Sequence, residues 1–336
     1  MLFIQKVIHK KTKQPRLVVI GGGHGIATVL EGLRDYPVDL AAIISMADNG
    51  GSSGTLRREL GVLPPGDVRR ALVALAGDER RLFADMAAYR FTGGALAGHT
   101  LGNLMLVALA HMTGSFSKGL HAVHELFGAR GRVIPVTLEL GELCAEYADG
   151  SVVRGETNID ISKRGAVPAI RRVWLEPSVR PNPEALTAIR GADVIIFGPG
   201  DLFTSIIPNI LVRGIAEAIK KSSAKKIMIV NYRTKQSETG GFSAMDFVGE
   251  LERYLGEGVL DAALCTTTRM SPDWLAGIAR EGGELVSCRG IGTARARLFV
   301  RSLLTTHGIL RHDPKKLARA IMAFLKTKEK NGNRRA

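Results

Sequence analysis

The feature that most constrains the fold is a pattern in which a short apolar run leads into a glycine-rich turn and then into a helical segment. LVVI at residues 17–20 precedes GGGHGIATVLEGL at residues 21–33. The same order returns in ADVIIFGPGDLFTSIIPNIL at residues 192–211. Continuous apolar runs are typical of strands covered by helices on both faces of a parallel sheet. The pattern therefore predicts an α/β protein.

The alternation continues along the chain. Further strands are expected at residues 38–47, 225–232, 262–267, 284–288 and 297–304, and helices at 63–77, 98–112, 272–282 and from Asp313 onward. We predict a Rossmann-like, doubly wound, mostly parallel sheet with right-handed crossovers. The segments 133–140, 145–157 and 170–175 favour a small β-rich insertion near 130–175, with a hairpin at the ADG turn.

The charge of the chain is concentrated at its ends. Of the net charge of +14, residues 1–16 carry +5 and residues 315–336 carry +7, which leaves +2 between them. We predict basic disordered tails at 1–15 and 326–336 around a single domain at 16–325. A body so close to neutrality argues against a nucleic-acid groove, although the ends themselves could contact RNA or an anionic surface.

Hydropathy and cysteine content limit the cellular compartments in which we expect the protein. No apolar stretch approaches the length of about 20 residues that spans a bilayer, and the first residues lack the pattern of a signal peptide. The expected location is cytoplasmic. Cys144, Cys265 and Cys288 are odd in number and no Cys-x-x-Cys occurs. They are expected to be buried thiols rather than a disulfide framework or a zinc site.

The glycine-rich turns predict an anion site. In a parallel sheet they lie together at the carboxyl ends of the strands, where ligands bind, and a bare turn before a helix offers N–H groups to phosphate. GGGHG is neither the dinucleotide fingerprint nor a Walker motif. The predicted diphosphate cradle consists of Gly21, Gly22, Gly23 and Gly25, with His24 donating to a phosphate or narrowing the pocket. A turn made for close packing is the alternative.

A second loop adds carboxylates and hydroxyls. Its candidates are Asp48, Asn49, Gly51, Ser52 and Ser53. Asp67, in PPGD, is either a helix N-cap or a second carboxylate facing Asp48, and such a pair could hold Mg²⁺ through water. A flexible surface loop is the alternative for GGSSG.

Other strand ends supply further polar groups. His99 and Asn103 are four residues apart at a predicted helix start, which is the spacing of two side chains on one face of a helix. The remaining candidates are Gly198, Gly200, Asp201, Thr204, Ser205, Asn209 and Asn231. The convergence of these groups predicts a nucleotide site. No G-x-S-x-G or H-E-x-x-H motif is present, so catalytic residues are unassigned, with Asp48 and Asp67 as candidates.

Six motifs carry a family resemblance. GGGHG, ADNGGSSGTLRREL, PPGDVRRALVALA, GHTLGNL, GPGDLFTSIIPN and RHDPKKLA resemble, in order and spacing, the gluconeogenesis factor (YvcK-like) family, which is related to the 2-phospho-L-lactate transferase CofD. The resemblance extends from about residue 16 to about residue 325.

This resemblance implies a cytoplasmic, non-catalytic regulator. It would bind a nucleotide sugar such as UDP-N-acetylglucosamine and influence cell shape and envelope synthesis during gluconeogenic growth. An unidentified protein partner and a homo-oligomer are also implied. The alternative is the transferase reaction, in which a phospholactyl group moves from a guanosine diphospho-donor to a deazaflavin with Mg²⁺. GGSSG and PPGD are more similar to the YvcK branch.

Three positions depart from the family pattern. The family usually has threonine where His24 stands, aspartate where Asn49 stands and serine where Asp201 stands. Asn49 removes a negative charge, which would weaken any catalysis that depends on it. Asp201 brings a carboxylate to a phosphate-binding turn, and is expected either to reposition the diphosphate or to require a compensating cation.

Overall fold

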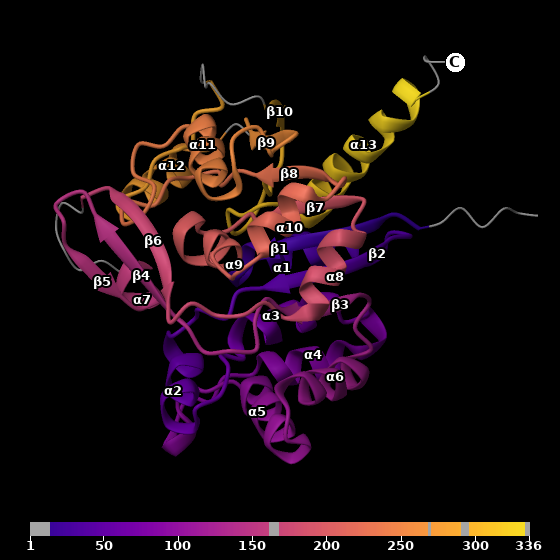
Figure 1. Ribbon diagram of the computed structural model, residues 1–336, viewed down its shortest axis with the longest axis vertical. Helices are drawn as coiled ribbons and strands as arrows, with labels where there is room; N and C mark the ends of the chain where they lie inside the picture. The colour runs from indigo at the N-terminus through magenta and orange to yellow at the C-terminus, as the bar shows by residue number, and fades with distance from the viewer. Residues whose placement is uncertain (1–13, 161–167, 268–269, 290–295, 333–336) are drawn as a thin grey trace, which may run out of the picture.

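A parallel sheet forms the centre of the computed structural model, which describes residues 14–160, 168–267, 270–289 and 296–332 (Figure 1). Its strands are β1 (Arg16–Gly21), β2 (Asp39–Ile44), β3 (Arg132–Pro135), β7 (Val194–Phe197), β8 (Lys225–Ile229), β9 (Ala262–Thr266) and β10 (Arg297–Arg301). Their order is β10-β9-β8-β7-β1-β2-β3, and each neighbouring pair is parallel. This is the doubly wound order, so the predicted fold class is confirmed. The order reverses between β1 and β7, where such sheets open a ligand crevice.

Helices cover both faces of the sheet. One face carries α1 (Gly23–Leu33), α3 (Gly66–Leu75), α4 (Arg81–Ala88), α6 (Phe116–Phe127) and α13 (Pro314–Gly332); the other carries α8 (Pro183–Gly191), α9 (Ile207–Ile210), α10 (Ile215–Lys221) and α11 (Ala244–Leu255). Successive residues of β1 enter opposite cores, with Leu17 and Val19 in one and Val18 and Ile20 in the other. Burial on both faces explains why β1 is apolar without interruption.

The other helices lie around the carboxyl ends of the strands or flank the two faces. They are α2 (Gly51–Leu60), α5 (Leu101–Thr113), α7 (Glu156–Asp160), α12 (Pro272–Arg280), the short turns η1 (Asp78–Arg80) and η2 (Gly94–Leu96), and the π-helical η3 (Leu202–Ile206). Helix α5 packs against α6. Helices α2 and η3 each follow a glycine-containing turn, and Gly51, Ser52 and Ser53 of α2 and Thr204 and Ser205 of η3 line the crevice at the end of the sheet.

A second, antiparallel sheet projects from the main body (Figure 1). It consists of β4 (Glu142–Tyr147), β5 (Val152–Arg154) and β6 (Ile170–Glu176), in the order β5-β4-β6. This is the predicted β-rich insertion, but it begins later than predicted. Residues 133–135 belong to β3, which pairs with β2 in the main sheet. The apolar residues of segment 133–140 would suit a strand in either sheet. Because the segment follows helix α6, which packs on the main sheet, its first residues join the parallel sheet.

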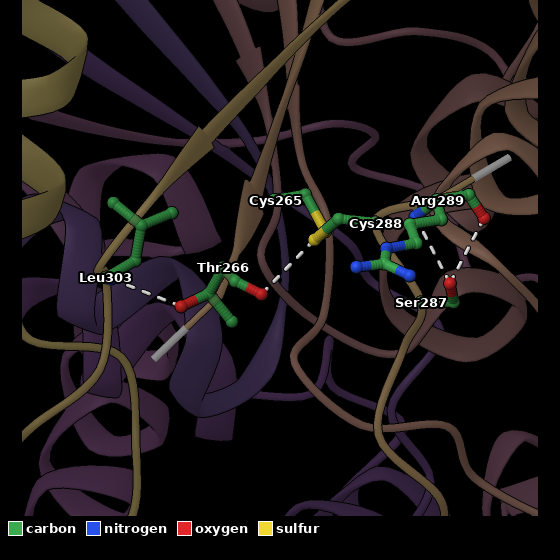
Figure 2. The surroundings of a disulfide bond; sticks show 6 residues. All are labelled: Cys265, Thr266, Ser287, Cys288, Arg289 and Leu303. Atoms are coloured by element: carbon green, nitrogen blue, oxygen red, sulfur yellow. Dashed lines mark hydrogen bonds between the residues drawn. A yellow bond between two sulfur atoms is a disulfide. The ribbon is translucent and has the colours of Figure 1, made fainter. Parts of the chain in front are cut away.

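Two cysteines depart from the prediction. Cys265, in β9, and Cys288 form a disulfide with their Cα atoms 6.0 Å apart (Figure 2). The prediction of free thiols is wrong for this pair, because two cysteines 23 residues apart meet only once the fold is formed. Segment 284–288 is not a regular strand. It is joined to residues 232–234 by a single bridge, Arg233 to Leu285, and by flanking hydrogen bonds. Cys144 is a buried free thiol, as expected.

The predicted tails fall largely outside the described residues. Helix α13 continues to Gly332, beyond the expected boundary at 325, while residues 1–13 and 333–336 are not described. Among the described residues, no single helix combines the length and apolar character needed to cross a bilayer. The bent pair 202–210 and 215–221 reaches that threshold only when both parts are counted together.

Candidate functional site

Two connected cavities occupy the crevice at the reversal point of the sheet. The smaller, which we call the cradle cavity, has a volume of about 460 Å³, and the larger, the outer cavity, about 1090 Å³. They share His24, Gly25, Arg69, Arg70, Arg90, Gly200 and Asp201. Segments far apart in the sequence therefore converge on one continuous site.

Many residues predicted from the sequence line these cavities. The cradle cavity is lined by Gly22, Gly23, His24, Gly25, Asp48, Gly51, Ser52, Ser53, Asp67, Asn103, Gly200, Asp201, Thr204 and Ser205, and the outer cavity by Asn231. Gly21, Asn49, His99, Gly198 and Asn209 line neither cavity. Asn209 is fully buried and donates to the carbonyl of Gly21 (3.3 Å), so it holds the end of β1 in place.

The glycine turn after β1 is shaped mainly by neighbouring chain segments. A Cβ on Gly25 would lie 2.0 Å from the Pro199 carbonyl oxygen, and one on Gly22 would lie 2.6 Å from Asp67 Oδ2. Gly23 adopts a φ of +64°, which favours glycine. Close packing therefore accounts for Gly22 and Gly25, and the backbone conformation accounts for Gly23. The positive N-terminal end of α1 still faces the cradle cavity.

Asp67 caps α1 rather than its own helix. Its Oδ2 accepts from the Gly23 N–H (2.8 Å) and its Oδ1 from Arg70 Nη1 (2.5 Å). The prediction of an N-cap for the helix at 63–77 is wrong, since Asp67 lies inside α3, whose N-cap is Pro65. Residues 23 and 67 are brought together only because α1 and α3 pack side by side.

The Asp48–Asp67 pair does not present two free carboxylates to a metal ion. Asp48 Oδ1 accepts from the Gly50 N–H (2.9 Å), and both oxygens of Asp67 are engaged. Burial, together with the charge of Asp67, raises the pKa of Asp48. A Mg²⁺ ion coordinated directly by Asp67 would compete with Arg70 for Oδ1, whereas the predicted site holds the ion through water and stays a prediction; we derive no step through it.

Arg69 is a site residue that the sequence reasoning missed. Its side chain lines both cavities although the residue is only 7% exposed. Nε donates to Asn103 Oδ1 (3.0 Å), while among the residues the structure describes neither Nη atom has an acceptor. Burial, with Arg70 and Arg90 nearby, lowers the pKa of Arg69 to about 10. It is therefore still a cation at neutral pH, with donors free for an anion. The sequence signal that could have indicated Arg69 as a site residue is the pair of adjacent arginines in PPGDVRRAL.

A hydrogen-bonded chain positions Arg69. Asn103 Nδ2 donates to Ser52 Oγ (3.1 Å), which lies 3.0 Å from His99 Nδ1. Since Ser52 accepts from Asn103, its own hydroxyl proton is free to point toward His99 Nδ1. His99 precedes α5 and is not on the helix face predicted for it. The chain runs from His99 through Ser52 and Asn103 to the guanidinium.

Helix α7 of the insertion brings a second missed residue, Glu156, to the cradle cavity. Burial and the charges of Asp48 and Asp67 raise the pKa of Glu156 to about 7. Asn49 holds this helix, because its Oδ1 accepts from the Thr157 N–H (2.9 Å). Asn49, which stands where the family usually has aspartate, thus connects the loop after β2 to the insertion.

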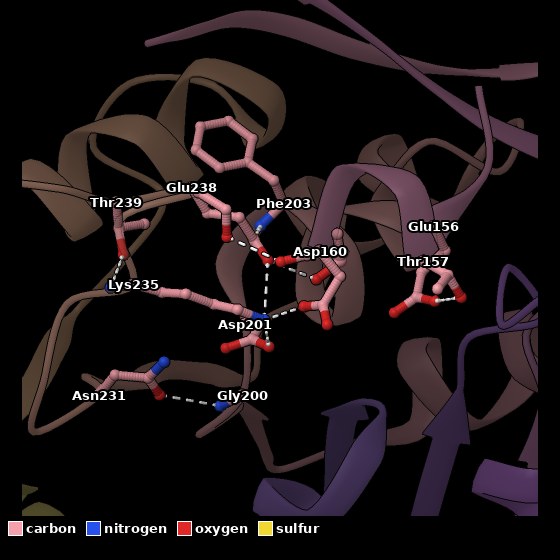
Figure 3. Close-up of polar contacts among 12 residues, drawn as sticks. Glu156, Thr157, Asp160, Gly200, Asp201, Phe203, Asn231, Lys235, Glu238 and Thr239 are labelled. Carbon is pink, nitrogen blue, oxygen red and sulfur yellow. Dashed lines mark hydrogen bonds and ion pairs between the residues drawn. The ribbon is translucent and has the colours of Figure 1, made fainter. Parts of the chain in front are cut away.

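The segment after β8 supplies the compensating cation expected for Asp201, which lies in the turn after β7. Lys235 Nζ lies 2.9 Å from Asp201 Oδ2, contacts Asp160, and lies 3.7 Å from Glu238 Oε1 (Figure 3). Glu238 in turn accepts from the Phe203 N–H (3.0 Å) and from Thr204 Oγ1 (2.8 Å).

Two predicted groups near this turn are less available than expected. The Gly200 N–H donates to Asn231 Oδ1 (3.0 Å), so it is already paired. His24 faces both cavities, and burial together with Arg70 lowers its pKa. The imidazole is therefore neutral at pH 7 and can donate to a ligand without adding charge.

Comparisons with known proteins agree with this architecture. Residues 17–300 match the protein family described as 2-phospho-L-lactate transferase CofD. A putative gluconeogenesis factor of Thermotoga maritima is 43% identical, with 91% of this chain and 98% of the relative covered. The gluconeogenesis factor of Bacillus subtilis is 38% identical, with 94% and 99% covered. A crystal structure of a UPF0052 family member from Bacillus halodurans superposes with a TM-score of 0.86 at 38% identity, covering 93% of this chain and 99% of that one.

Proposed function

The chain belongs to the CofD family and is similar to gluconeogenesis factors over most of its length, and from this premise we propose that it binds a nucleotide sugar and acts as a regulator. The ligand is of the UDP-N-acetylglucosamine type. Its binding would report nucleotide-sugar supply to a protein partner in the cytoplasm, and so influence cell shape and envelope synthesis. Self-association of the chain belongs to the same proposal.

The observation that carries this proposal is the guanidinium of Arg69, whose Nε is held by Asn103 while, among the described residues, its two Nη atoms have no acceptor in a side chain that lines both cavities. A phosphate is the anion that fits the two parallel donors of a guanidinium. The N-terminal end of α1 faces the same cavity, and a helix N-terminus favours negative charge. Together these groups favour a diphosphate in the cradle cavity.

The remaining volume and polarity suit the uncharged parts of such a ligand. The outer cavity, at about 1090 Å³, is large enough for a nucleoside or a sugar. Burial raises the pKa of Glu156 to about 7, so its carboxyl can be protonated near neutral pH and can both donate to and accept from hydroxyl groups, while Asp48 can accept from them. Asp48 and Glu156 would form hydrogen bonds with the hydroxyl groups of the sugar or ribose beside the diphosphate.

Titration calorimetry of the full chain with UDP-N-acetylglucosamine tests the proposal. Arg69→Met should weaken binding by about tenfold to a hundredfold, because a hydrogen bond to a charged group contributes about 1.5–3 kcal/mol. Arg190→Met, at an exposed position on α8, is the matched control and should bind like the parent. Arg69→Lys keeps the charge but loses the planar fork, so it should fall between them.

Circular dichroism and thermal melting establish that the Arg69 variants are folded. Unchanged affinity in a folded Arg69→Met protein would remove the guanidinium from the site. The transferase alternative is tested on the same preparations with a guanosine diphospho-donor, a deazaflavin acceptor and Mg²⁺. Release of GMP that requires all three would overturn the assignment as a non-catalytic regulator.

A further inference from the structure

Lys235 stands at the centre of a carboxylate set that three separate elements supply. Asp160 comes from the end of α7, Asp201 from the turn after β7, and Glu238 from the segment after β8 (Figure 3). One oxygen of each carboxylate lies within 4.8 Å of the others. Carboxylates so close together repel one another unless a cation lies among them. The Lys235 ammonium contacts Asp160 and Asp201 and is 3.7 Å from Glu238.

The lysine is held in this position by its own backbone. The Lys235 N–H donates to Thr239 Oγ1 (3.1 Å), and Ser237 Oγ donates to the Asp160 carbonyl (2.9 Å). The preceding residue, Thr234, exchanges hydrogen bonds with Glu284. The ammonium is therefore delivered by an ordered segment rather than by a freely moving surface side chain.

The neighbouring carboxylates face the ligand. Asp160 and Asp201 both line the cradle cavity. Without a cation they would place two negative charges beside a bound diphosphate. Burial and the charges of Glu238 and Glu156 raise the pKa of Asp201, whereas the Lys235 ammonium 2.9 Å away favours its ionised form. Glu238 accepts hydrogen bonds from Phe203 and Thr204 besides lying 3.7 Å from Lys235, so Asp160 and Asp201 depend on the lysine more than Glu238 does.

We propose that Lys235 is a positioning residue of the nucleotide-sugar site, whose ammonium takes the place that a divalent cation would otherwise fill among Asp160, Asp201 and Glu238. The inference rests on the proposed function and deepens it. The diphosphate binds without a metal ion, because the lysine neutralises the adjacent wall of the cradle cavity. The same ion pairs connect α7 of the insertion to the turn after β7, and so keep these two lining elements of the cradle cavity at a constant distance from each other.

Calorimetry with UDP-N-acetylglucosamine, in EDTA and in excess Mg²⁺, tests this directly. The parent protein should bind equally well in both. Lys235→Ala should lose about tenfold or more in EDTA and recover most of the loss in Mg²⁺, because the ion fills the vacated carboxylate set. A triple variant, Asp160→Asn, Asp201→Asn and Lys235→Met, has neither the cation nor the charges that need it. It should bind about threefold or more better than Lys235→Ala in EDTA, because the uncompensated charges are gone.

Three outcomes would overturn the inference. They are a parent protein that needs Mg²⁺, a Lys235→Ala protein that binds normally in EDTA, and a weakened Lys235→Ala protein that neither Mg²⁺ nor the triple variant restores. The last result would mean that the lysine only supports the fold.

A thermal-shift titration with Mg²⁺ alone separates this inference from the proposed function, since it uses no nucleotide. Mg²⁺ should raise the melting temperature of Lys235→Ala but not that of the parent or the triple variant. That pattern supports the inference even if no nucleotide sugar binds. If Mg²⁺ shifts none of the three proteins, the carboxylate set does not accept a cation in place of the lysine and the inference fails.

Discussion

The two sides of the crevice balance their charges in opposite ways. On the β1 side, Asp67 is paired with Arg70 and the neighbouring Arg69 has free donors. On the β7 side, a single lysine serves Asp160, Asp201 and Glu238. Among the described residues, Arg69 on the first side has donors without an acceptor, whereas on the second side one lysine is shared among three carboxylates. The diphosphate is therefore expected to be held from the β1 side, beside carboxylates of the β7 side that Lys235 neutralises.

The two sides are also held together differently. On the β1 side, hydrogen bonds connect α1, α2, α3 and α5 through residues such as Asp67 and Asn103. On the β7 side, segment 232–234 pairs with segment 284–288, and the disulfide fastens that segment to β9. Substitutions can therefore be designed to affect the β1 side, the β7 side, or the contact between the turns after β1 and β7, which we call the seam.

The largest effect is expected at the seam. Gly25→Ala places a Cβ 2.0 Å from the Pro199 carbonyl oxygen, where backbone meets backbone and neither can easily move. We expect a loss of about 3 kcal/mol or more in the free energy of unfolding, measured by denaturant titration. Gly249→Ala is the control, because it lies on an exposed helical position with no atom within 4 Å of the new Cβ. It should stabilise the protein by about 0.5–1 kcal/mol. Equal stability of the two variants would contradict the close packing of the turns.

Removal of the disulfide should weaken the β7 side selectively. A crosslink that closes a loop of 23 residues is worth about 3 kcal/mol in the chain-entropy account. The variant with Cys265→Ala and Cys288→Ala should lose about that much stability. Hydrogen exchange should become faster in segments 232–238 and 284–288, and stay the same in segment 48–70. Cys144→Ala serves as the control for loss of a thiol alone. Uniformly faster exchange would show that the two sides are not held independently.

The smallest effect concerns pH. The pKa of Glu156 is about 7, so the carboxyl is neutral below that pH and repels a diphosphate above it. Affinity for UDP-N-acetylglucosamine should fall about threefold to tenfold between pH 6 and pH 8. Because the folded pKa lies above the ordinary value, the same group lowers folding stability as pH rises from about 4.5 to about 7. Glu156→Gln should flatten the binding profile and the exposed Glu257→Gln should not. An equally steep profile in Glu156→Gln would assign the titration to another group.

Much of the fold could be predicted from local patterns. The apolar runs of β1, β2, β7, β8 and β9 and the turns at 21–25 and 198–200 indicate strands and helix starts without reference to distant residues. The segment 133–140 shows the limit of this reasoning. Its apolar character indicates a strand, but only its neighbour β2 decides that β3 belongs to the parallel sheet.

The candidate site could be predicted in outline but not in its pairings. The sequence indicates that polar residues gather at the strand ends, and most of those named line the cavities. The partner of each one was not predictable. Asp67 meets Gly23 across 44 positions, and Asn49 meets Thr157 across 108. Arg69 was missed because an arginine in a helical pattern reads as a solvated charge until the fold buries it.

The sequence by itself determined the alternation of strands and helices, the places where the chain turns on glycine, and the edge of the sheet where polar groups collect. Each of these follows from the conformational and hydrophobic preferences of neighbouring residues. The tertiary structure alone decided that Asp67 caps α1, that Lys235 serves three carboxylates, that Cys265 meets Cys288, and that Arg69 keeps free donors in a buried site. Those outcomes depend on which distant segments the sheet order brings within a few ångströms, and short-range preferences do not specify that order.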